Sequence, residues 1–419
     1  MDENNLFELG VSLLGLGVGA SVLFPQSSTL IYTSYLFGVS AILYKVLNLN
    51  KWPRFFRACG LYVKEDKYIL SPSLLEKTRT SYGYCLRFKP VAGLTTKDLI
   101  AKQDKFEEFL NARVEISYWN KNIFIKVFDS NSLENDFELV DTKGIVELVI
   151  GRGYRGVETL DLSASESNVH LLIAGTTGGG KTSLLRSIIT TLIATKDPKE
   201  LKLFLLDLKG TEFRIFERCG MVEGFARDTE ESFELLKKVR KEVDRRNNLF
   251  YERDVVDILE YNRKYKKLPH WLVVADEFHL LRNSESQVGI FEELAAICRS
   301  VGIHLILCTQ RPSADVITGL LKANIPTVIG LKTNNELNSR IILGESESDL
   351  ARLRGKGHGI LKKGGEKVEF QGMWLAPEDA REILKSYYVE RENNRAEAKI
   401  GEVDLAFLDR YREQKHSDN

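Results

Sequence analysis

The first 50 residues differ from the rest of the chain in their hydrophobic pattern. Residues 9–44 contain no Asp, Glu, Lys, Arg or His, and the residues PQSS at positions 25–28 interrupt the apolar stretch. The two apolar segments, residues 6–24 and 26–44, are each 19 residues long, which is about the length of a helix that crosses the bilayer core. The pattern predicts a transmembrane hairpin within residues 1–50. A buried helical hairpin of a soluble domain, or a single re-entrant segment, is the alternative.

Basic residues follow the second apolar segment. Lys45, Lys51, Arg54 and Arg57 occur there with no acidic residue among them, and basic residues beside a membrane span mark its cytoplasmic side. The N-terminus is acidic, unlike that of a secretory signal. We therefore expect a cell-membrane protein with two spans, with both termini and the rest of the chain in the cytoplasm.

The next 100 residues alternate short apolar strands with polar turns. Residues 84–88, 114–118 and 123–128 have the composition of strands, and residues 96–110 that of a helix. This pattern predicts a small α+β module over residues 51–150. No chemical motif occurs in it.

Buried strands of another type occur between residues 151 and 385. Four short apolar runs, each followed by polar residues, alternate with helical segments; they are residues 170–174, 201–206, 271–275 and 303–308. Strands that alternate with helices predict a doubly wound α/β domain with a mostly parallel sheet. Residues 386–419 are polar and charged, and they predict a C-terminal tail.

A glycine-rich motif follows the first of these strands. Its residues are Gly175, Thr176, Thr177, Gly178, Gly179, Gly180, Lys181 and Thr182. The pattern GxxxxGKT between a strand and a helix is typical of a P-loop, in which backbone N–H groups surround the phosphates of a nucleotide. We expect ATP here, with Lys181 reaching its β- and γ-phosphates and Thr182 bound to Mg²⁺. The alternative is a glycine-rich turn that binds nothing.

Two acidic residues end the strand at residues 271–275. Ligands of parallel sheets bind at the carboxyl ends of the strands, so Asp276 is a candidate ligand of the Mg²⁺ shell and Glu277 a candidate base that orients the attacking water. Gln310 lies just after the strand at residues 303–308, and it is expected beside the γ-phosphate. The alternative for the acidic pair is a solvated strand end.

Composition adds few constraints. The 59 basic and 59 acidic residues give a net charge of zero, which does not exclude a nucleic-acid partner because only a local basic stripe is needed. The five cysteines are scattered, with no CxxC pair, so neither a zinc site nor a disulfide framework is supported.

The chain resembles the FtsK/SpoIIIE family of DNA-pumping ATPases from residue 302 to residue 326, GIHLILCTQRPSADVITGLLKANIP. Further blocks fit the family: DLKG at residues 207–210, VDRR at 243–246, NSR at 338–340 and GKGHG at 355–359. The resemblance covers about residues 145–376. Residues 207–209 depart from the family pattern, because they are DLK where DPK is commoner.

This resemblance implies a RecA-like P-loop motor over residues 151–385 that forms a homo-hexameric ring with DNA in its channel. Arg299 and Arg340 are then candidates for an arginine that stabilises the transition state at a subunit interface, although either could be a structural ion pair. Arg311 is a weaker candidate. Lys322 is a candidate DNA contact, ahead of Lys209 and Arg214, and the alternative for each is a solvated side chain.

The membrane hairpin and the short tail are similar to those of the coupling proteins of Gram-positive conjugative plasmids and integrative elements (the TcpA and ConQ type). That resemblance implies a membrane-anchored translocase that feeds DNA to a conjugation channel, with a relaxase and channel proteins as partners. A chromosome- or phage-related DNA pump, or a protein-secretion ring ATPase, are the alternatives.

Overall fold

The structure is a computed structural model, and it describes residues 51–389 except residues 66, 130–132, 134, 165–168, 284–288 and 345–348. The chain divides into two compact units between residues 131 and 132, here called the N-terminal unit and the C-terminal unit. The predicted spans, residues 6–24 and 26–44, lie outside the described residues. Within the described part, no helix has both the length and the apolar character needed to cross a membrane.

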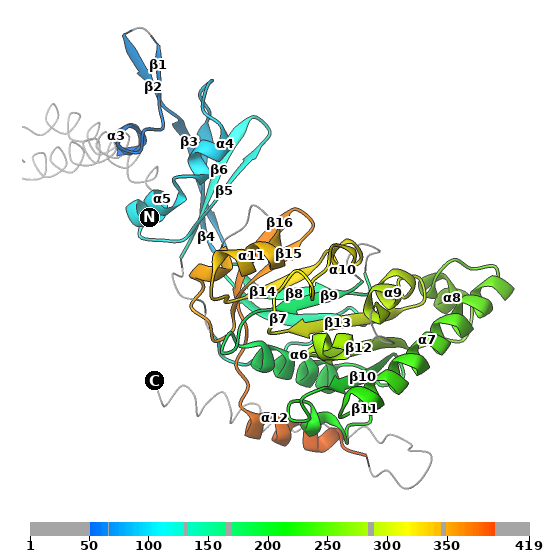
Figure 1. The fold of residues 1–419 in the computed structure, drawn as a ribbon. Coiled ribbons are helices and arrows are strands. Elements are labelled where there is room, and N and C mark those ends of the chain that lie inside the picture. The colour runs from blue at the N-terminus through cyan, green and yellow to red at the C-terminus, as the bar shows by residue number, and fades with distance from the viewer. Residues whose placement is uncertain are drawn as a thin grey trace, which may run out of the picture. The chain divides into compact units, whose positions relative to one another are not determined.

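The N-terminal unit combines short helices with antiparallel strands (Figure 1). Its elements are α3 (Lys51–Ala58), β1 (Val63–Glu65), β2 (Tyr68–Leu70), β3 (Ser73–Thr80), β4 (Gly83–Lys89), α4 (Thr96–Ile100), α5 (Gln103–Leu110), β5 (Val114–Trp119) and β6 (Asn122–Phe128). The helix expected over residues 96–110 is thus divided into α4 and α5.

Alternation along the strands builds the core of this unit. Strands β3, β4, β6 and β5 form an antiparallel sheet in that order, and β1 and β2 form a separate hairpin. Alternate residues of β4 and β6, such as Leu86, Phe88 and Ile125, are buried with residues of α3, α4 and α5. One face of the sheet is therefore covered by helices, as in other antiparallel sheets with one buried face.

The C-terminal unit is an α/β structure. Its strands are β7 (Glu147–Gly153), β8 (Gly156–Asp161), β9 (Leu171–Ala174), β10 (Leu201–Asp207), β11 (Val222–Ala226), β12 (His270–Asp276), β13 (Ile303–Thr309), β14 (Val328–Leu331), β15 (His358–Lys363) and β16 (Glu366–Gln371). Its α-helices are α6 (Lys181–Thr195), α7 (Thr229–Glu252), α8 (Ile258–Lys264), α9 (Ile290–Ile297), α10 (Gly319–Asn324), α11 (Glu336–Leu343) and α12 (Pro377–Leu384). Short 3₁₀ helices are η1 (Arg214–Phe216), η2 (Phe278–Asn283), η3 (Asp349–Arg352) and η4 (Lys385–Tyr387).

Its strands form one sheet in the order β11-β10-β12-β13-β9-β14-β15-β16-β7-β8. The five pairings from β11 to β14 are parallel, and the four from β14 to β8 are antiparallel. The sheet is therefore mixed rather than mostly parallel. The sequence pattern predicted β9, β10, β12 and β13 of the parallel half, but not β11, β14 or the hairpins of the antiparallel half.

Both faces of the parallel half are buried. Successive residues of β12 alternate between two apolar clusters, because Val273 packs on one side of the sheet and Val274 on the other. Helix α6 covers one face, and the amphipathic α7 covers the other (Figure 1). The side chain of Asp228 caps the N-terminus of α7 by accepting a hydrogen bond from the N–H of Glu231.

The limits of the units differ from those expected from the sequence. Strand β7 pairs with β16, so residues 147–153 belong to the large sheet, and the division falls near residue 131 rather than 150. At the other end, residues expected in a polar tail are part of the fold. The N–H of Val389 donates to the carbonyl of Arg218, and the N–H of Gly220 donates to that of Tyr387. Residues 390–419 lie outside the described residues.

Candidate active site

The glycine-rich loop lies between the end of β9, in the middle of the sheet, and the first turn of α6. Gly178 and Gly180 have φ angles of 79° and 100°, which residues with a Cβ rarely adopt. A Cβ at Gly180 would lie 2.1 Å from the backbone nitrogen of Gly357. The glycines therefore allow both the left-handed backbone and the close approach of a second loop. The backbone follows the course that a phosphate-binding loop requires.

The second loop is part of the GKGHG block, and its backbone donates hydrogen bonds to the P-loop. The N–H of Gly357 donates to the carbonyl of Gly179 at 2.7 Å, and the N–H of Lys356 donates to that of Gly178 at 3.2 Å. Gln371 then donates from Nε2 to the carbonyl of Lys356 at 2.7 Å. From the sequence, this block was recognised only because it resembles the family pattern. That its backbone supports the P-loop is visible only in the structure.

The acidic pair lies at the end of β12, as predicted. Asp276 and Glu277 are both buried, and Glu277 has a φ of 55°. A left-handed backbone at a residue with a long side chain costs about 1–2 kcal/mol. Such strain is found mainly where the surrounding structure fixes a functional side chain. Here it turns the Glu277 carboxylate toward the P-loop lysine.

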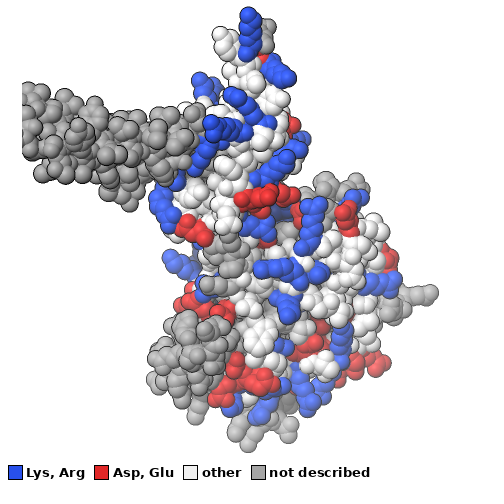
Figure 2. All heavy atoms as spheres, turned by 90° about the vertical axis from the view of Figure 1, so that its left-hand side faces the viewer, with Lys and Arg blue, Asp and Glu red and all other residues white. Residues whose placement is uncertain are grey.

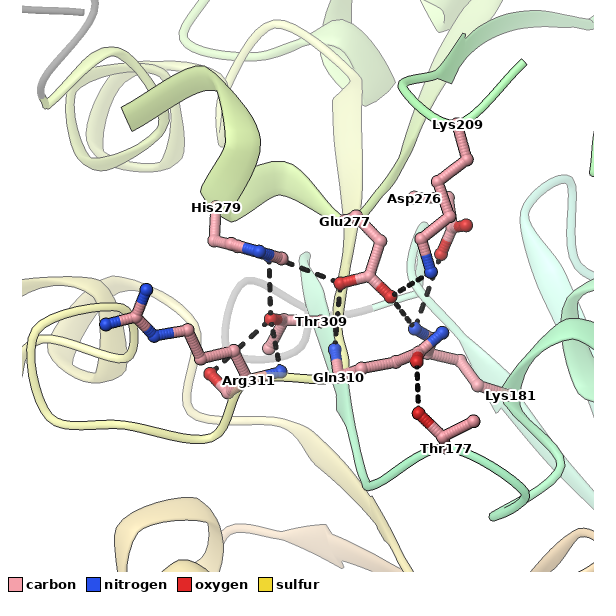
Figure 3. Close-up of polar contacts among 9 residues, drawn as sticks. All are labelled: Thr177, Lys181, Lys209, Asp276, Glu277, His279, Thr309, Gln310 and Arg311. Carbon is pink, nitrogen blue, oxygen red and sulfur yellow. Dashed lines mark hydrogen bonds and ion pairs between the residues drawn. The ribbon is translucent and has the colours of Figure 1, made fainter. Parts of the chain in front are cut away.

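Lysine side chains surround this carboxylate on one side (Figure 3). Nζ of Lys181 lies 2.5 Å from Oε1 of Glu277 and 3.5 Å from Oδ1 of Asp276. Nζ of Lys209 lies 3.1 Å from the same Oε1 of Glu277. Lys209 follows β10, Asp276 and Glu277 end the neighbouring strand β12, and Lys181 begins α6, so the four groups meet at the carboxyl ends of the parallel strands.

The other oxygen of Glu277 is held by β13 and the turn after β12 (Figure 3). Oε2 accepts a hydrogen bond from the N–H of Gln310 at 2.9 Å and lies 3.2 Å from Nδ1 of His279. The side chain of Gln310 accepts a hydrogen bond from Oγ1 of Thr177 at 2.7 Å. Gln310 thus connects the acidic pair to the P-loop, and its place beside the γ-phosphate stays a prediction. His279 was not predicted.

The electrostatics distinguish the two acids. Burial raises the pKa of Asp276 despite the nearby Lys181. Burial also acts to raise the pKa of Glu277, but hydrogen bonds from Lys181 and from the N–H of Gln310 outweigh it, so this pKa is lowered. Glu277 is therefore a carboxylate at neutral pH. Burial lowers the pKa of His279, which keeps its imidazole neutral.

The acidic side chains at the ends of β10 and β12 are suited to holding a hydrated Mg²⁺ ion beside a nucleotide. Among the described residues, Oδ1 of Asp276 and Oδ1 of Asp207 are buried and accept no hydrogen bond. The register of the sheet aligns these two residues. Thr182 lies in the first turn of α6, at the end of the P-loop. Hard oxygen donors of this kind suit Mg²⁺, which keeps several waters. In the sequence, Asp207 stood out only as the first residue of the DLKG block.

The predicted arginine and DNA-contact residues lie elsewhere in the C-terminal unit. Within the described residues, the partners of Glu277 do not include Arg299, Arg340 or Lys322. Arg299 is exposed just after α9, and Arg340 is exposed on α11, where it lies 3.3 Å from Glu336. Lys322 is half-buried in α10. Their roles stay predictions.

The weaker candidates are also separate from the P-loop lysine. Arg311 is exposed and forms an ion pair with Asp315 at 3.2 Å. Arg214 is exposed in η1. Lys209, in contrast, contacts Glu277 directly. This contact favours a role for Lys209 beside the P-loop, rather than the contact to DNA that the sequence left open.

Comparison with known proteins agrees with this site. Residues 135–279 match the FtsK/SpoIIIE family. The chain contains an FtsK/SpoIIIE family domain. The DNA translocase FtsK of Borreliella burgdorferi is 36% identical over 243 residues, which cover 55% of this chain and 29% of that protein. The DNA translocase SpoIIIE of Bacillus subtilis is 31% identical over 362 residues, which cover 80% of this chain and 45% of that protein. The chain thus spans less than half the length of either relative.

Solved structures show the same fold around the FtsK/SpoIIIE domain. The pCW3 conjugation coupling protein TcpA, in a monomer form with ATPγS, matches with a TM-score of 0.55 and 24% identity, covering 80% of this chain and 98% of that one. The cytoplasmic domain of the type VII secretion ATPase EccC of Thermomonospora curvata matches with a TM-score of 0.52 and 26% identity, covering 59% of this chain and 32% of that one. The C-terminal unit is a RecA-like P-loop ATPase fold with a mixed sheet.

Proposed function

We propose that this chain is an ATPase that couples hydrolysis of ATP to movement of DNA. The observation that carries the proposal is the arrangement of Lys181, Asp276 and Glu277 around the end of the P-loop, within a domain of the FtsK/SpoIIIE family. The relatives named DNA translocases support DNA as the substrate.

The geometry suggests how hydrolysis proceeds. Lys181 binds the β- and γ-phosphates, which requires its Nζ to leave Oε1 of Glu277. Lys209 and the N–H of Gln310 still hold the two oxygens of that carboxylate. Glu277 then stays oriented and ionised, and it positions the water that attacks the γ-phosphate. Thr182 and Asp276 would hold Mg²⁺, which neutralises charge on the phosphates.

A ring of identical subunits fits the exposure of the predicted arginines. Arg299 and Arg340 are exposed, and an exposed arginine is available to a nucleotide bound by a neighbouring subunit. We propose a homo-hexamer in which one of them stabilises the transition state. Lys322 is the proposed contact to DNA phosphates in the channel.

The cellular role that we propose is that of a membrane-anchored coupling protein of conjugation. Its support is the apolar pattern of residues 6–44 and the likeness in fold to the coupling protein TcpA. Residues 1–50 would anchor the motor on the cytoplasmic side of the cell membrane. A relaxase bound to DNA and the channel proteins are the partners that such a role needs. A chromosomal or phage-related DNA pump is the alternative with the same motor.

A second candidate function rests on the likeness to a type VII secretion ATPase. In that case the ring would move protein substrates, and DNA would not change its rate of hydrolysis. The dependence on DNA therefore separates the two functions.

The experiment is ATP hydrolysis by the purified full-length chain in detergent, with and without duplex or single-stranded DNA, at low and moderate salt. A DNA translocase should be stimulated by DNA of any sequence, and the stimulation should fall as salt rises because phosphate contacts release counterions. The variants Lys181→Ala and Glu277→Gln should lack activity in every condition. Hydrolysis that is indifferent to DNA would contradict the DNA proposal and favour the secretion function.

A further inference from the structure

Large apolar side chains are unusually exposed in the N-terminal unit. Among the described residues, eight of the fifteen exposed large hydrophobic side chains lie in it, although it is much the smaller unit: Tyr68, Ile69, Leu70, Leu75, Ile100, Phe109, Tyr118 and Trp119. Tyr68 and Trp119 are 75% and 71% exposed. Clusters of exposed apolar residues mark surfaces that bind a partner or a membrane.

The register of the sheet brings most of these residues to one end. Ser73 at the start of β3 pairs with Lys89 at the end of β4, and Ile123 of β6 pairs with both Phe88 and Tyr118. Trp119 therefore lies at the same end as the start of β3, which follows directly from the β1–β2 hairpin. We call this end, with residues 63–65, 67–75, 89–95 and 118–122, the apolar end of the unit.

The loop after β4 joins the hairpin to the β5–β6 turn. A Cβ at Gly93 would lie 3.3 Å from a methyl group of Val63 in β1. The same loop, residues 90–96, lines a hollow together with Tyr118 and Ile123. The loop after β4 thus borders both the base of the hairpin and the end of the sheet at which β5 and β6 turn.

The chain enters and leaves this unit at different ends. Helix α3 begins the described residues at Lys51, and the ring of Trp52 lies 4.9 Å from that of Phe88, near the apolar end. The chain leaves after β6, where Asp129 forms an ion pair with Arg79 at 2.5 Å and Phe128 pairs with Gly83, at the opposite end of the sheet. Trp52, in the first turn of α3, thus packs against the residue that precedes Lys89 at the apolar end, whereas the chain leaves the unit at the opposite end.

The N-terminal unit is positively charged, and its apolar end shares in the excess. Residues 51–129 contain 15 basic and 9 acidic residues, a net charge of +6, although the whole chain is neutral. Within the hairpin, Glu65 and Asp66 balance Lys64 and Lys67. The exposed Lys89 and Lys121 therefore give the apolar end a net charge of +2, and the rest of the excess lies elsewhere in the unit. Figure 2 shows Lys and Arg side chains outnumbering acidic ones over the visible face of this unit.

We propose that the apolar end is a membrane-docking surface, which places Tyr68, Ile69 and Trp119 among the headgroups of an anionic bilayer. Tyrosine and tryptophan favour the membrane interface, and lysines beside them bind anionic lipid with about 1 kcal/mol each. Both features occur together at the apolar end. The proposal rests on the membrane location in the proposed function, and it adds a second, peripheral contact to the predicted anchor.

The test uses the full-length chain reconstituted in vesicles of phosphatidylcholine, with or without phosphatidylglycerol. An environment-sensitive fluorophore is attached at Tyr68→Cys or Trp119→Cys, and lipids that carry a quencher report contact with the bilayer. Tyr251→Cys is the matched control, because Tyr251 is 89% exposed on α7 in the C-terminal unit. Unsubstituted protein, labelled in parallel, corrects for the native cysteines, of which Cys85 is the one that is not buried.

We expect quenching at positions 68 and 119 in anionic vesicles, weaker quenching in phosphatidylcholine alone, and none at position 251. Lys89→Gln and Lys121→Gln should each lower the ratio of docked to undocked protein about fivefold, and added salt should lower it further. Labels that stay unquenched on protein that floats with vesicles would overturn the proposal. Labels that respond to added duplex DNA or to protein concentration, but not to lipid, would also overturn the proposal.

Failure of docking is distinguishable from failure of the proposed function. Flotation with vesicles at alkaline pH measures anchoring, and ATP hydrolysis in detergent measures the motor. If the protein does not float but both labels respond to anionic vesicles, docking stands and the anchor does not.

Discussion

The two units place their apolar side chains differently. In the C-terminal unit, the parallel strands are buried on both faces, and polar groups gather at one edge of the sheet. In the N-terminal unit, one face of the sheet is covered and large apolar side chains are exposed at one end. The comparison shows that a hydrolysis site leaves a strong trace in the sequence, because it needs particular residues at particular spacings. The proposed docking surface needs only exposed apolar and basic residues, with no fixed spacing between them. These residues become neighbours through the register of the strands.

The largest effect that we expect concerns the C-terminal unit. Lys181→Ala and Glu277→Gln should each lower the rate of ATP hydrolysis about 10³-fold, because each removes a charge directed at the reacting phosphate or its attacking water. Steady-state hydrolysis measures this. Tyr251→Ser, at an exposed site of the same unit, should keep the unsubstituted rate. Substantial hydrolysis by either active-site variant would contradict the assignment.

The second effect is on stability against acid, and it should distinguish the units. Burial lowers the pKa of His170 to about 4, and burial with the nearby Arg246 lowers that of His270 to about 4. Both are near 6.5 when unfolded, so the unfolded chain binds more protons below that pH. Each histidine should then contribute about 3 kcal/mol of stability above pH 6.5, lost progressively as the pH falls to 4.

Hydrogen exchange at pH 7 and pH 4.5 measures this loss separately in each unit. Residues 51–129 contain no histidine, so the N-terminal unit serves as the internal control for the protonation of carboxylates. Equal losses of stability in the two units would show that the buried histidines do not determine the sensitivity to acid.

A third effect tests the loop that supports the P-loop. Gly357 has a φ of 89°, and a Cβ there would lie 3.1 Å from Nε2 of Gln371. Gly357→Ala should lower the free energy of unfolding by about 1–2 kcal/mol and weaken nucleotide binding. Titration with a fluorescent ATP analogue and thermal unfolding measure the two changes. Gly365→Ala, where nothing lies within 4 Å of the added Cβ, should change neither. Unchanged nucleotide affinity in the Gly357 variant would show that the P-loop does not depend on this loop.

The smallest effect concerns Lys209. Lys209→Ala should lower kcat about fivefold with little change in KM, because Lys209 orients the carboxylate of Glu277 and is itself partly exposed. Lys199→Ala, at an exposed lysine before β10, is the control. A change in KM alone would instead place Lys209 at the substrate.

The comparison also explains which predictions from the sequence were accurate. The strands β9, β10, β12 and β13 were predicted because each is a short buried run followed by polar residues. Strand β8 and the hairpin β15–β16 were not predicted, because their polar residues do not follow a helix-linked pattern. The short parallel strands β11 and β14, of five and four residues, were not predicted either. Strand β7 was assigned to the wrong unit, since its partner β16 lies more than 200 residues later in the chain. Pairing over that distance leaves no local signal.

The sequence by itself determined the P-loop, the acidic pair and four of the buried strands, because phosphate binding requires fixed residue types next to one another. The tertiary structure decided what those residues contact. It placed Lys209, His279 and Asp207 at the site, supported the P-loop with the backbone of residues 355–357, and collected exposed aromatic residues at one end of the N-terminal unit. The physical reason is that these arrangements depend on strand register and on loops that meet only in the folded chain. A spacing along the sequence can specify a loop, but only packing brings two loops together.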